Sequence, residues 1–236
     1  MIWLGIDTSN VPLSIAVVKD NQLLVEWTSS IKVTHSVGAM PAVEEALKQA
    51  NINPGEIDVI AVAEGPGSYT GVRIGVTIAK TLAWTLKIPL VGVSSLQTIA
   101  GNGLLFNGLI CPIMDARRDN VFSAIYTNDL IADLPDGHYA IETILEKLAL
   151  KQENVLFVRK DVSIHWQAIQ RVLGDRAIRA PFYLDLPKAS VVIEQAMKKP
   201  LPSIEETHHF VPEYKRITEA ETNWRAEQQK VGESND

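Results

Sequence analysis

A glycine-rich stretch has the composition of a phosphate-binding loop that runs into a helix: Ala63–Trp84, AEGPGSYTGVRIGVTIAKTLAW. A Walker-type phosphate loop needs four residues between its two glycines and a lysine directly after the second, so that backbone N–H groups and the lysine surround the phosphates. Here three residues separate Gly67 from Gly71, and Val72 stands where the lysine is required. The dinucleotide-binding pattern also fails, because Thr70 takes the place of its third glycine.

The same stretch still predicts a tight turn from a strand into a helix. Gly65 and Gly67 can take positive φ, Ser68 or Thr70 can cap the helix, and Arg73 lies in its first turn. An anion could dock at such a helix N-terminus, although most helix N-termini bind none. Two interpretations therefore stay open, a structural corner and an anion site, and the corner is favoured.

Two carboxylates end apolar runs in related surroundings, Asp7 and Asp115. They could hold a hydrated magnesium ion between two lobes, or they could only begin turns, which is the slightly favoured interpretation. No two of the five histidines stand four apart as a helical metal pair would, and Cys111 lies in an apolar run typical of a buried structural thiol. We therefore predict no catalytic residue, no metal site and no cofactor. The candidate cleft or anion-site residues are Asp7, Thr8, Gly67, Ser68, Arg73 and Asp115.

Composition places the chain among ordinary globular proteins. It has 236 residues, which is long enough to bury a substantial core without disulfides or metal. Its N-terminus has neither a basic region nor a long apolar run, so we expect a cytoplasmic protein without a membrane span. The net charge of −6 argues against tight binding of a nucleic-acid backbone by this chain alone.

The order of apolar runs predicts the fold class, which is α/β. Three consecutive strands over residues 2–6, 13–18 and 23–28 are joined by turn-forming residues and predict an antiparallel meander. A helical pattern, a buried strand over 57–63, the helix after the glycine-rich turn and a strand over 88–93 follow. This order is that of a ribonuclease H-like lobe with later parallel crossovers.

A weak internal repeat predicts a second lobe of the same kind. Residues 109–126 echo residues 1–18, with an apolar strand that ends in Asp, a polar turn and a second apolar strand. Alternating helix-like and strand-like segments continue to Lys199. We therefore expect an N-terminal lobe over residues 1–104, a C-terminal lobe over 105–225 and a polar, disordered tail over 226–236.

The helix after the turn carries a stripe of small residues: Gly71, Gly75, Ala79 and Ala83. Glycine inside a helix costs about 1 kcal/mol relative to alanine, so close packing should compensate for it. The stripe could lie against the chain's own sheet, or against a second helix from another chain. Periodicity shows which residues share a face but not what covers it, so both alternatives stay open.

Several segments together resemble one known family. The stretches GIDTSNVPLSIAV, HSVGAMPAVEEAL, GPGSYTGVRIGVTIAKTLAW, IPLVGVSSLQTIA, MDARRDNVFSAIY and VPEYKRITEAETNW look like the TsaB (YeaZ) family. They stand in family order over nearly the whole chain, and only residues 127–205 match loosely. The resemblance implies the actin-like ATPase (ASKHA) fold, built from two ribonuclease H-like lobes.

The resemblance also implies a non-catalytic role. The catalytic relative, TsaD, carries a metal-binding H-x-x-x-H motif that falls here on Ser95 and Ile99, and neither is a normal metal ligand. In the second lobe, Arg117 and Arg118 bring bulk and charge to a turn where related ATPases carry small residues. Both substitutions argue against nucleotide binding by this chain alone.

By resemblance, the chain pairs with a TsaD-type catalytic subunit and a TsaE-type ATPase. The resemblance implies that this complex transfers threonylcarbamoyl to N6 of adenosine 37 in tRNA. The chain would contact tRNA only as part of the complex, and without its partners it would form a homodimer. The rival hypotheses are an independent ASKHA-type ATPase, kinase or peptidase, and a homodimeric small-ligand module. The residues predicted for the partner interface are His35, Val37, Met40, Val43, Leu47, Gly71, Val72, Gly75, Ile78, Ala79, Leu82 and Ala83.

Overall fold

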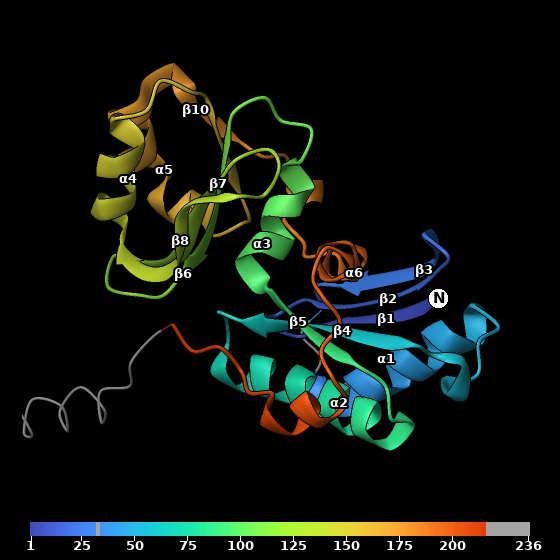
Figure 1. Cartoon of the computed structure of the whole chain (residues 1–236). Coiled ribbons are helices and arrows are strands. Elements are labelled where there is room, and N and C mark those ends of the chain that lie inside the picture. The colour runs from blue at the N-terminus through green and yellow to red at the C-terminus, as the bar shows by residue number, and fades with distance from the viewer. Residues whose placement is uncertain (32–33, 216–236) are drawn as a thin grey trace, which may run out of the picture.

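The chain folds into two lobes, each built on a five-stranded sheet (Figure 1). The structure is a computed structural model that describes residues 1–31 and 34–215. The predicted tail over residues 226–236 lies outside the described residues. No helix in the described part of the chain is long and apolar enough to cross a membrane.

The first sheet has the order β3-β2-β1-β4-β5. Its strands are β1 (Ile2–Asp7), β2 (Leu13–Lys19), β3 (Gln22–Ser29), β4 (Val59–Gly65) and β5 (Leu90–Ser94). Strands β1, β2 and β3 pair antiparallel, whereas β4 and β5 join in parallel. The predicted meander and the parallel strands that follow it are confirmed.

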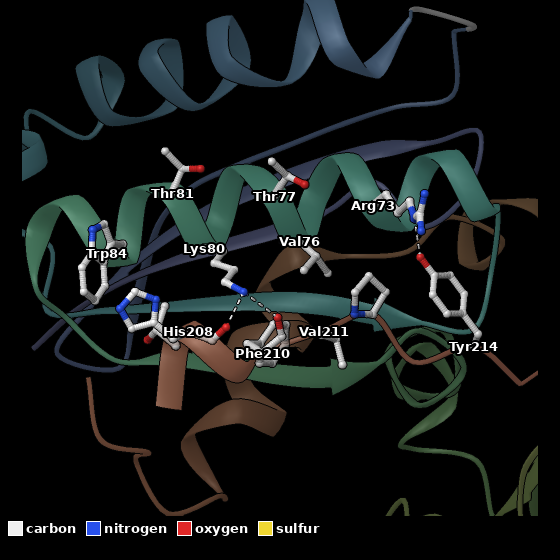
Figure 2. A pocket seen from close by; sticks show the side chains of 12 residues that line it. Arg73, Val76, Thr77, Lys80, Thr81, Trp84, His208, Phe210, Val211 and Tyr214 are labelled. Carbon is white, nitrogen blue, oxygen red and sulfur yellow. Dashed lines mark hydrogen bonds between the residues drawn. The ribbon is translucent and has the colours of Figure 1, made fainter. Parts of the chain in front are cut away.

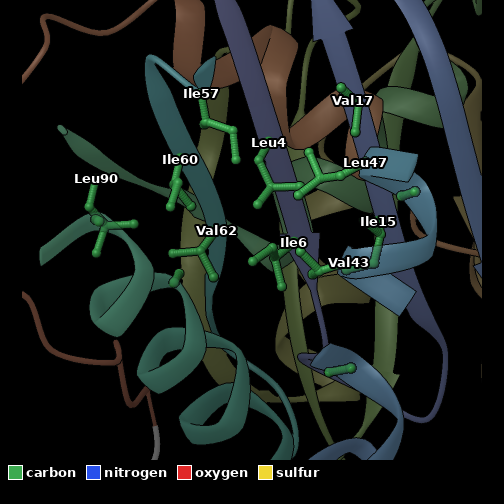
Figure 3. Packing of buried hydrophobic residues seen from close by; sticks show 14 of the residues in the cluster. Leu4, Ile6, Ile15, Val17, Val43, Leu47, Ile57, Ile60, Val62 and Leu90 are labelled. Carbon is green, nitrogen blue, oxygen red and sulfur yellow. The ribbon is translucent and has the colours of Figure 1, made fainter. Parts of the chain in front are cut away.

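Both faces of this sheet are buried, which is why its central strands read as continuous apolar runs. Leu4 and Ile6 of β1 face the helices α1 (His35–Gln49) and α2 (Tyr69–Leu86), as Figure 3 shows, while Trp3 faces the opposite side. Side chains alternate between the two faces along a strand, so one strand supplies two separate cores. The two helices form one outer layer of the molecule (Figure 1).

Helix α2 approaches β1 closely through its small residues. A Cβ on Gly71 would lie 2.3 Å from the carbonyl oxygen of Thr8, and a Cβ on Gly75 would lie 2.3 Å from Thr8 Oγ1. Ala79 and Ala83 are fully buried in the same core. The stripe therefore packs on the chain's own sheet, which is the first of the two alternatives.

The second sheet, β10-β9-β6-β7-β8, repeats the order of the first. Its strands are β6 (Leu109–Asp115), β7 (Asn120–Tyr126), β8 (Ala132–Ala140), β9 (Val155–Val158) and β10 (Ala177–Arg179). Strands β6, β7 and β8 pair antiparallel, and β9 and β10 join in parallel. The internal repeat is confirmed, and the two ribonuclease H-like lobes make the actin-like ATPase fold that was predicted.

Four further α-helices and five short 3-10 helices complete the described fold. The α-helices are α3 (Ser95–Ala100), which joins the lobes, α4 (Ile141–Ala149), α5 (Val162–Leu173) and α6 (Ala189–Met197). The 3-10 helices are η1 (Pro54–Glu56), η2 (Gly101–Gly103), η3 (Gly174–Arg176), η4 (Phe182–Leu184) and η5 (Glu205–His209). Helices α4 and α5 cover one face of the second sheet, and α3 covers the other.

Helix α6 corrects one expectation. The helix predicted near residues 190–199 exists, but it packs on the first sheet, so its assignment to the second lobe is wrong. Val192 and Ile193 join the core around Trp3, and a Cβ on Gly5 would lie 2.6 Å from the Ala189 carbonyl oxygen. The chain thus returns to the first lobe after β10, as Figure 1 shows for α6 above β1 and β2.

The contact between α2 and β1 yields a stability prediction. In Gly71→Ala the new methyl group meets a backbone oxygen of Thr8 that cannot rotate away. We expect a net loss of about 1–3 kcal/mol in the free energy of unfolding, measured by urea denaturation. Gly55→Ala is the matched control, because no heavy atom lies within 4 Å of the added Cβ. Equal stability of the two variants would contradict the close approach.

Candidate functional site

The turn after β4 is a structural corner held by the chain itself. Gly65 has φ of +117°, as predicted, but Gly67 does not have positive φ, so that expectation is wrong. Gly67 is required for space, because a Cβ there would lie 2.2 Å from the Ser9 carbonyl oxygen. Ser68, one of the two predicted caps, accepts a hydrogen bond from Gly71 N at 3.3 Å.

The loop after β1 binds both sides of this turn. Ser68 N donates to the Ser9 carbonyl oxygen at 2.7 Å, and Thr8 Oγ1 donates to the Gly71 carbonyl oxygen at 2.7 Å. An N-terminal N–H group that is already paired is not available to a phosphate oxygen. These contacts fix the corner, and the anion site stays a prediction.

Asp7 is fully buried at the end of β1. Burial raises the pKa of its carboxyl, while hydrogen bonds from Ser9 and the nearby charges of Arg159 and His35 act in the opposite direction. Its Oδ1 accepts from Ser9 N at 2.8 Å. Its other oxygen, Oδ2, is buried without a hydrogen-bond partner among the described residues.

Asp115 takes the equivalent place at the end of β6, as the repeat predicted. Its carboxyl Oδ1 lies 3.5 Å from Nε2 of the buried His165. Among the described residues, no group of three or more His, Cys, Asp or Glu side chains is placed to hold a metal ion. A hydrated magnesium ion held by Asp7 and Asp115 alone would need only these two carboxylates, and that alternative stays a prediction.

The positions that correspond to the TsaD metal ligands belong to the core. Ser95 and Ile99 are both fully buried in α3, and Ser95 Oγ accepts from Gly65 N at 3.2 Å. In the second-lobe turn, Arg117 and Arg118 are exposed and have φ of +68° and +53°. Cys111 is buried as predicted, and burial raises the pKa of its thiol to about 12.

A C-terminal segment that sequence reasoning did not place lies along α2. We call residues 205–215, η5 and the extended chain after it, the C-terminal strap. Lys80 Nζ donates to the carbonyl oxygens of His208 at 2.7 Å and Phe210 at 3.1 Å, as Figure 2 shows. The rings of Trp84 and His208 are in tilted contact, with centroids 3.8 Å apart and an interplanar angle of 52°. These contacts fix the strap to the C-terminal half of α2.

The other end of the strap meets the N-terminal end of α2. Arg73 Nε donates to Tyr214 Oη at 2.7 Å (Figure 2), and its guanidinium lies 4.2 Å from the centre of the Tyr69 ring. Arg73, predicted for the anion site, therefore pairs with the strap instead. A groove of about 710 Å³ remains between α2 and the strap.

The residues predicted for the partner interface fall into an exposed, a half-buried and a buried group. Val37 is 70% exposed and Met40 is 43% exposed on α1, and a groove of about 600 Å³ lies beside them between α1 and α2. His35, Ile78 and Leu82 are half-buried, and His35 Nε2 lies 2.6 Å from the Asn10 carbonyl oxygen. The buried members are Val43, Leu47, Gly71, Val72, Gly75, Ala79 and Ala83.

Of the two alternatives for the small-residue stripe, the structure supports the first, because those four residues pack against the first sheet. A partner on this face would touch the exposed side chains beside the stripe. The α1–α2 face, defined by Val37, Met40, Ile78 and Leu82 around the groove, is thus the candidate contact surface. Its use as an interface stays a prediction.

The sequence matches known proteins over most of its length. The family model described as TsaD, tRNA N6-adenosine threonylcarbamoyltransferase, matches residues 29–224. The tRNA threonylcarbamoyladenosine biosynthesis protein TsaB of Bacillus subtilis (strain 168) is 43% identical over 227 residues, which cover 95% of this chain and 98% of that protein. The chain belongs to the TsaB family. The chain therefore has a role in the biosynthesis of threonylcarbamoyladenosine in tRNA. The resemblance that the sequence motifs indicated is confirmed.

Two further TsaB-family comparisons agree. TsaB of Escherichia coli (strain K12) is 34% identical over 128 residues, which cover 53% of this chain and 55% of that protein. The solved structure of YeaZ from Pseudomonas aeruginosa has a TM-score of 0.74 at 20% identity, over 90% of this chain and 100% of that chain. At that identity the likeness shows the fold alone.

The strap yields a local-stability prediction. Lys80→Met keeps the aliphatic stem but removes the ammonium group that binds two strap carbonyls. A hydrogen bond of this kind contributes about 1 kcal/mol, so hydrogen exchange of strap amides should rise roughly fivefold while exchange in β1 stays unchanged. Lys48→Met on α1 removes an equivalent charge elsewhere and is the control. Unchanged strap exchange in Lys80→Met would show that Lys80 does not hold the strap.

Proposed function

We propose that this chain is the non-catalytic scaffold subunit of the complex that transfers threonylcarbamoyl to N6 of adenosine 37 in tRNA. In this proposal a TsaD-type subunit carries out the transfer, and a TsaE-type ATPase docks on the pair. The chain contacts tRNA only through the complex and works in the cytoplasm. The N-terminal lobe supplies the pairing helices.

The observation that carries the proposal is the exposed α1–α2 face in a member of the TsaB family. Val37 and Met40 expose apolar side chains next to an apolar groove whose walls include Leu47, Leu82 and Leu86. Contiguous exposed apolar surface of this kind is typical of a protein–protein contact. In the absence of a partner the same face would serve a homodimer, because a two-fold contact joins identical patches.

The rival hypothesis of an independent ATPase, kinase or peptidase finds less support in the same site. The turn that would cradle a phosphate pairs with Thr8 and Ser9. Arg73, which could neutralise an anion, binds Tyr214 and lies over Tyr69. A ligand would have to displace these contacts, at the cost of each hydrogen bond that it breaks.

The proposal predicts the effect of charge on the α1–α2 face. The double substitution Val37→Glu and Met40→Glu places two carboxylates where the partner would bury apolar area. Burying an unpaired charge is strongly unfavourable, so we expect at least about 30-fold weaker binding to a TsaD-type subunit. Analytical ultracentrifugation or calorimetry with the purified partner measures it.

The control for this prediction is Ile164→Glu on α5, because Ile164 is also exposed, at 62%, but lies on the second lobe. It should bind the partner as the parent does. The melting temperature of the double variant should equal that of the parent, since both replaced side chains are exposed. Undiminished partner binding by the double variant would refute the proposed interface.

A further inference from the structure

The groove between α2 and the C-terminal strap is cationic and aromatic. We call it the α2–strap groove; its lining includes the cations Arg73 and Lys80 and the rings of Trp84 and Tyr214. Among the described residues, no Asp or Glu lines it. Helix α2 itself has no acidic residue, although the whole chain has 28 acidic side chains against 22 basic ones. The groove therefore differs in charge from the protein that carries it.

Both cations of the groove are bound to uncharged acceptors. Lys80 Nζ donates to the carbonyl oxygens of His208 and Phe210, and Arg73 Nε donates to Tyr214 Oη. In the described part of the chain, neither cation forms an ion pair with a carboxylate. An ammonium group has three N–H donors and a guanidinium has five, so each cation keeps donors for a further acceptor.

The acidic side chains of the strap lie outside the groove. Glu213 forms an ion pair with Lys215. Glu205 lines a neighbouring hollow together with Lys87, and Glu206 accepts a hydrogen bond from a backbone N–H just before η5. The two cations therefore dominate the electrostatic potential inside the groove, and that potential favours an anionic occupant.

Two aromatic side chains stand exposed at opposite ends of the groove. Trp84 is 50% exposed and Tyr214 is 44% exposed, and Figure 2 shows Lys80 between them. Arg73, beside Tyr214, and Trp84 are eleven residues apart on α2, which corresponds to roughly 16 Å along the helix. Exposed rings next to cations provide flat faces on which planar groups can stack.

An occupant that matches these features is anionic and carries planar groups. Single-stranded RNA has both, because its phosphates pair with cations and its bases stack on aromatic side chains. Its bases are accessible only where the strand is unpaired, since a double helix keeps them stacked inside. An acidic peptide would match the charge of the groove but would offer the exposed rings no planar partner.

We propose that the α2–strap groove binds an unpaired segment of the tRNA when this chain is part of its complex. Arg73 and Lys80 contact phosphates, while Trp84 and Tyr214 stack on bases. The inference rests on the proposed function, because a net charge of −6 makes RNA binding by the isolated chain weak at physiological salt. The groove adjoins the α1–α2 face along α2, so RNA bound there lies beside the catalytic subunit.

Ultraviolet cross-linking of the isolated chain tests the groove without any partner. The probe is a single-stranded oligoribonucleotide of about 12 nucleotides, at about 20 mM salt, where phosphate contacts are strongest. We expect RNA on the tryptic peptide 81–87, which carries Trp84. Unlabelled RNA should compete, and polyglutamate should not. Cross-links only to second-lobe peptides, no cross-link at all, or equal competition by polyglutamate would overturn the proposal.

The affinity of the assembled complex for tRNA tests the charge of the groove. Thr77→Glu combined with Thr81→Glu adds two carboxylates at exposed groove positions and leaves the strap contacts in place. With a TsaD-type subunit at about 150 mM salt, fluorescence anisotropy should show at least about tenfold weaker tRNA binding. The matched control, Thr77→Gln combined with Thr81→Gln, should stay within about threefold of the parent.

Trp84→Leu tests stacking separately from charge. Loss of a stacking ring should weaken tRNA binding by the complex roughly 5- to 150-fold, and Trp84→Phe, which keeps a ring, should restore most of it. Pairing with the TsaD-type subunit is measured in parallel by ultracentrifugation. A parent chain that does not pair refutes the proposed function, and the cross-linking result still decides the groove. Equal tRNA binding by the Glu and Gln double variants, or by Trp84→Leu and the parent, would overturn the inference while pairing stays intact.

Discussion

The structure depends on an exchange of helices between its two sheets. Helix α3, which follows the first sheet, covers the second, and α6, which follows the second sheet, covers the first. The N-terminal amides of α6 are satisfied by side chains of the first lobe, because Ala189 N donates to Ser14 Oγ and Ser190 N to Glu26 Oε1, both at 2.9 Å. Neither lobe can detach without exposing a sheet face, because each sheet is covered by a helix that the other lobe's chain segment leads into.

The exchange also decides which surface is left for a partner. Because α6 closes one face of the first sheet, α1 and α2 become an outer layer whose inner side is core and whose outer side keeps Val37 and Met40 in solvent. The close approach of Gly71 to Thr8 brings α2 close to the first sheet. The C-terminal strap binds along another side of α2 through Lys80. At the corner after β4, Thr8 and Ser9 bind the start of α2, and Arg73 in its first turn binds Tyr214 of the strap.

Local chemistry in the sequence was sufficient to predict most of this fold. Strands buried on both faces give apolar runs, and the Asp-ended repeat identifies the second lobe. Strand β8 was missed because Pro135, Asp136 and Gly137 interrupt its pattern. The sequence could not predict which sheet α6 packs on, or which element packs against the small-residue stripe of α2. Periodicity shows which residues share a helix face but not which element packs against that face. Lys80 and His208 lie 128 residues apart in the chain, and no local signal links them.

The central claim is that this chain is required for threonylcarbamoyl transfer without performing it. Reconstitution from purified proteins tests it most directly, with threonylcarbamoyl-adenylate, tRNA, a TsaD-type subunit and a TsaE-type ATPase, and with this chain present or omitted. Modification of adenosine 37 is measured by mass spectrometry of the digested tRNA. We expect modification only when this chain and the TsaD-type subunit are both present. Modification by this chain without the TsaD-type subunit, or undiminished modification without this chain, would contradict the claim.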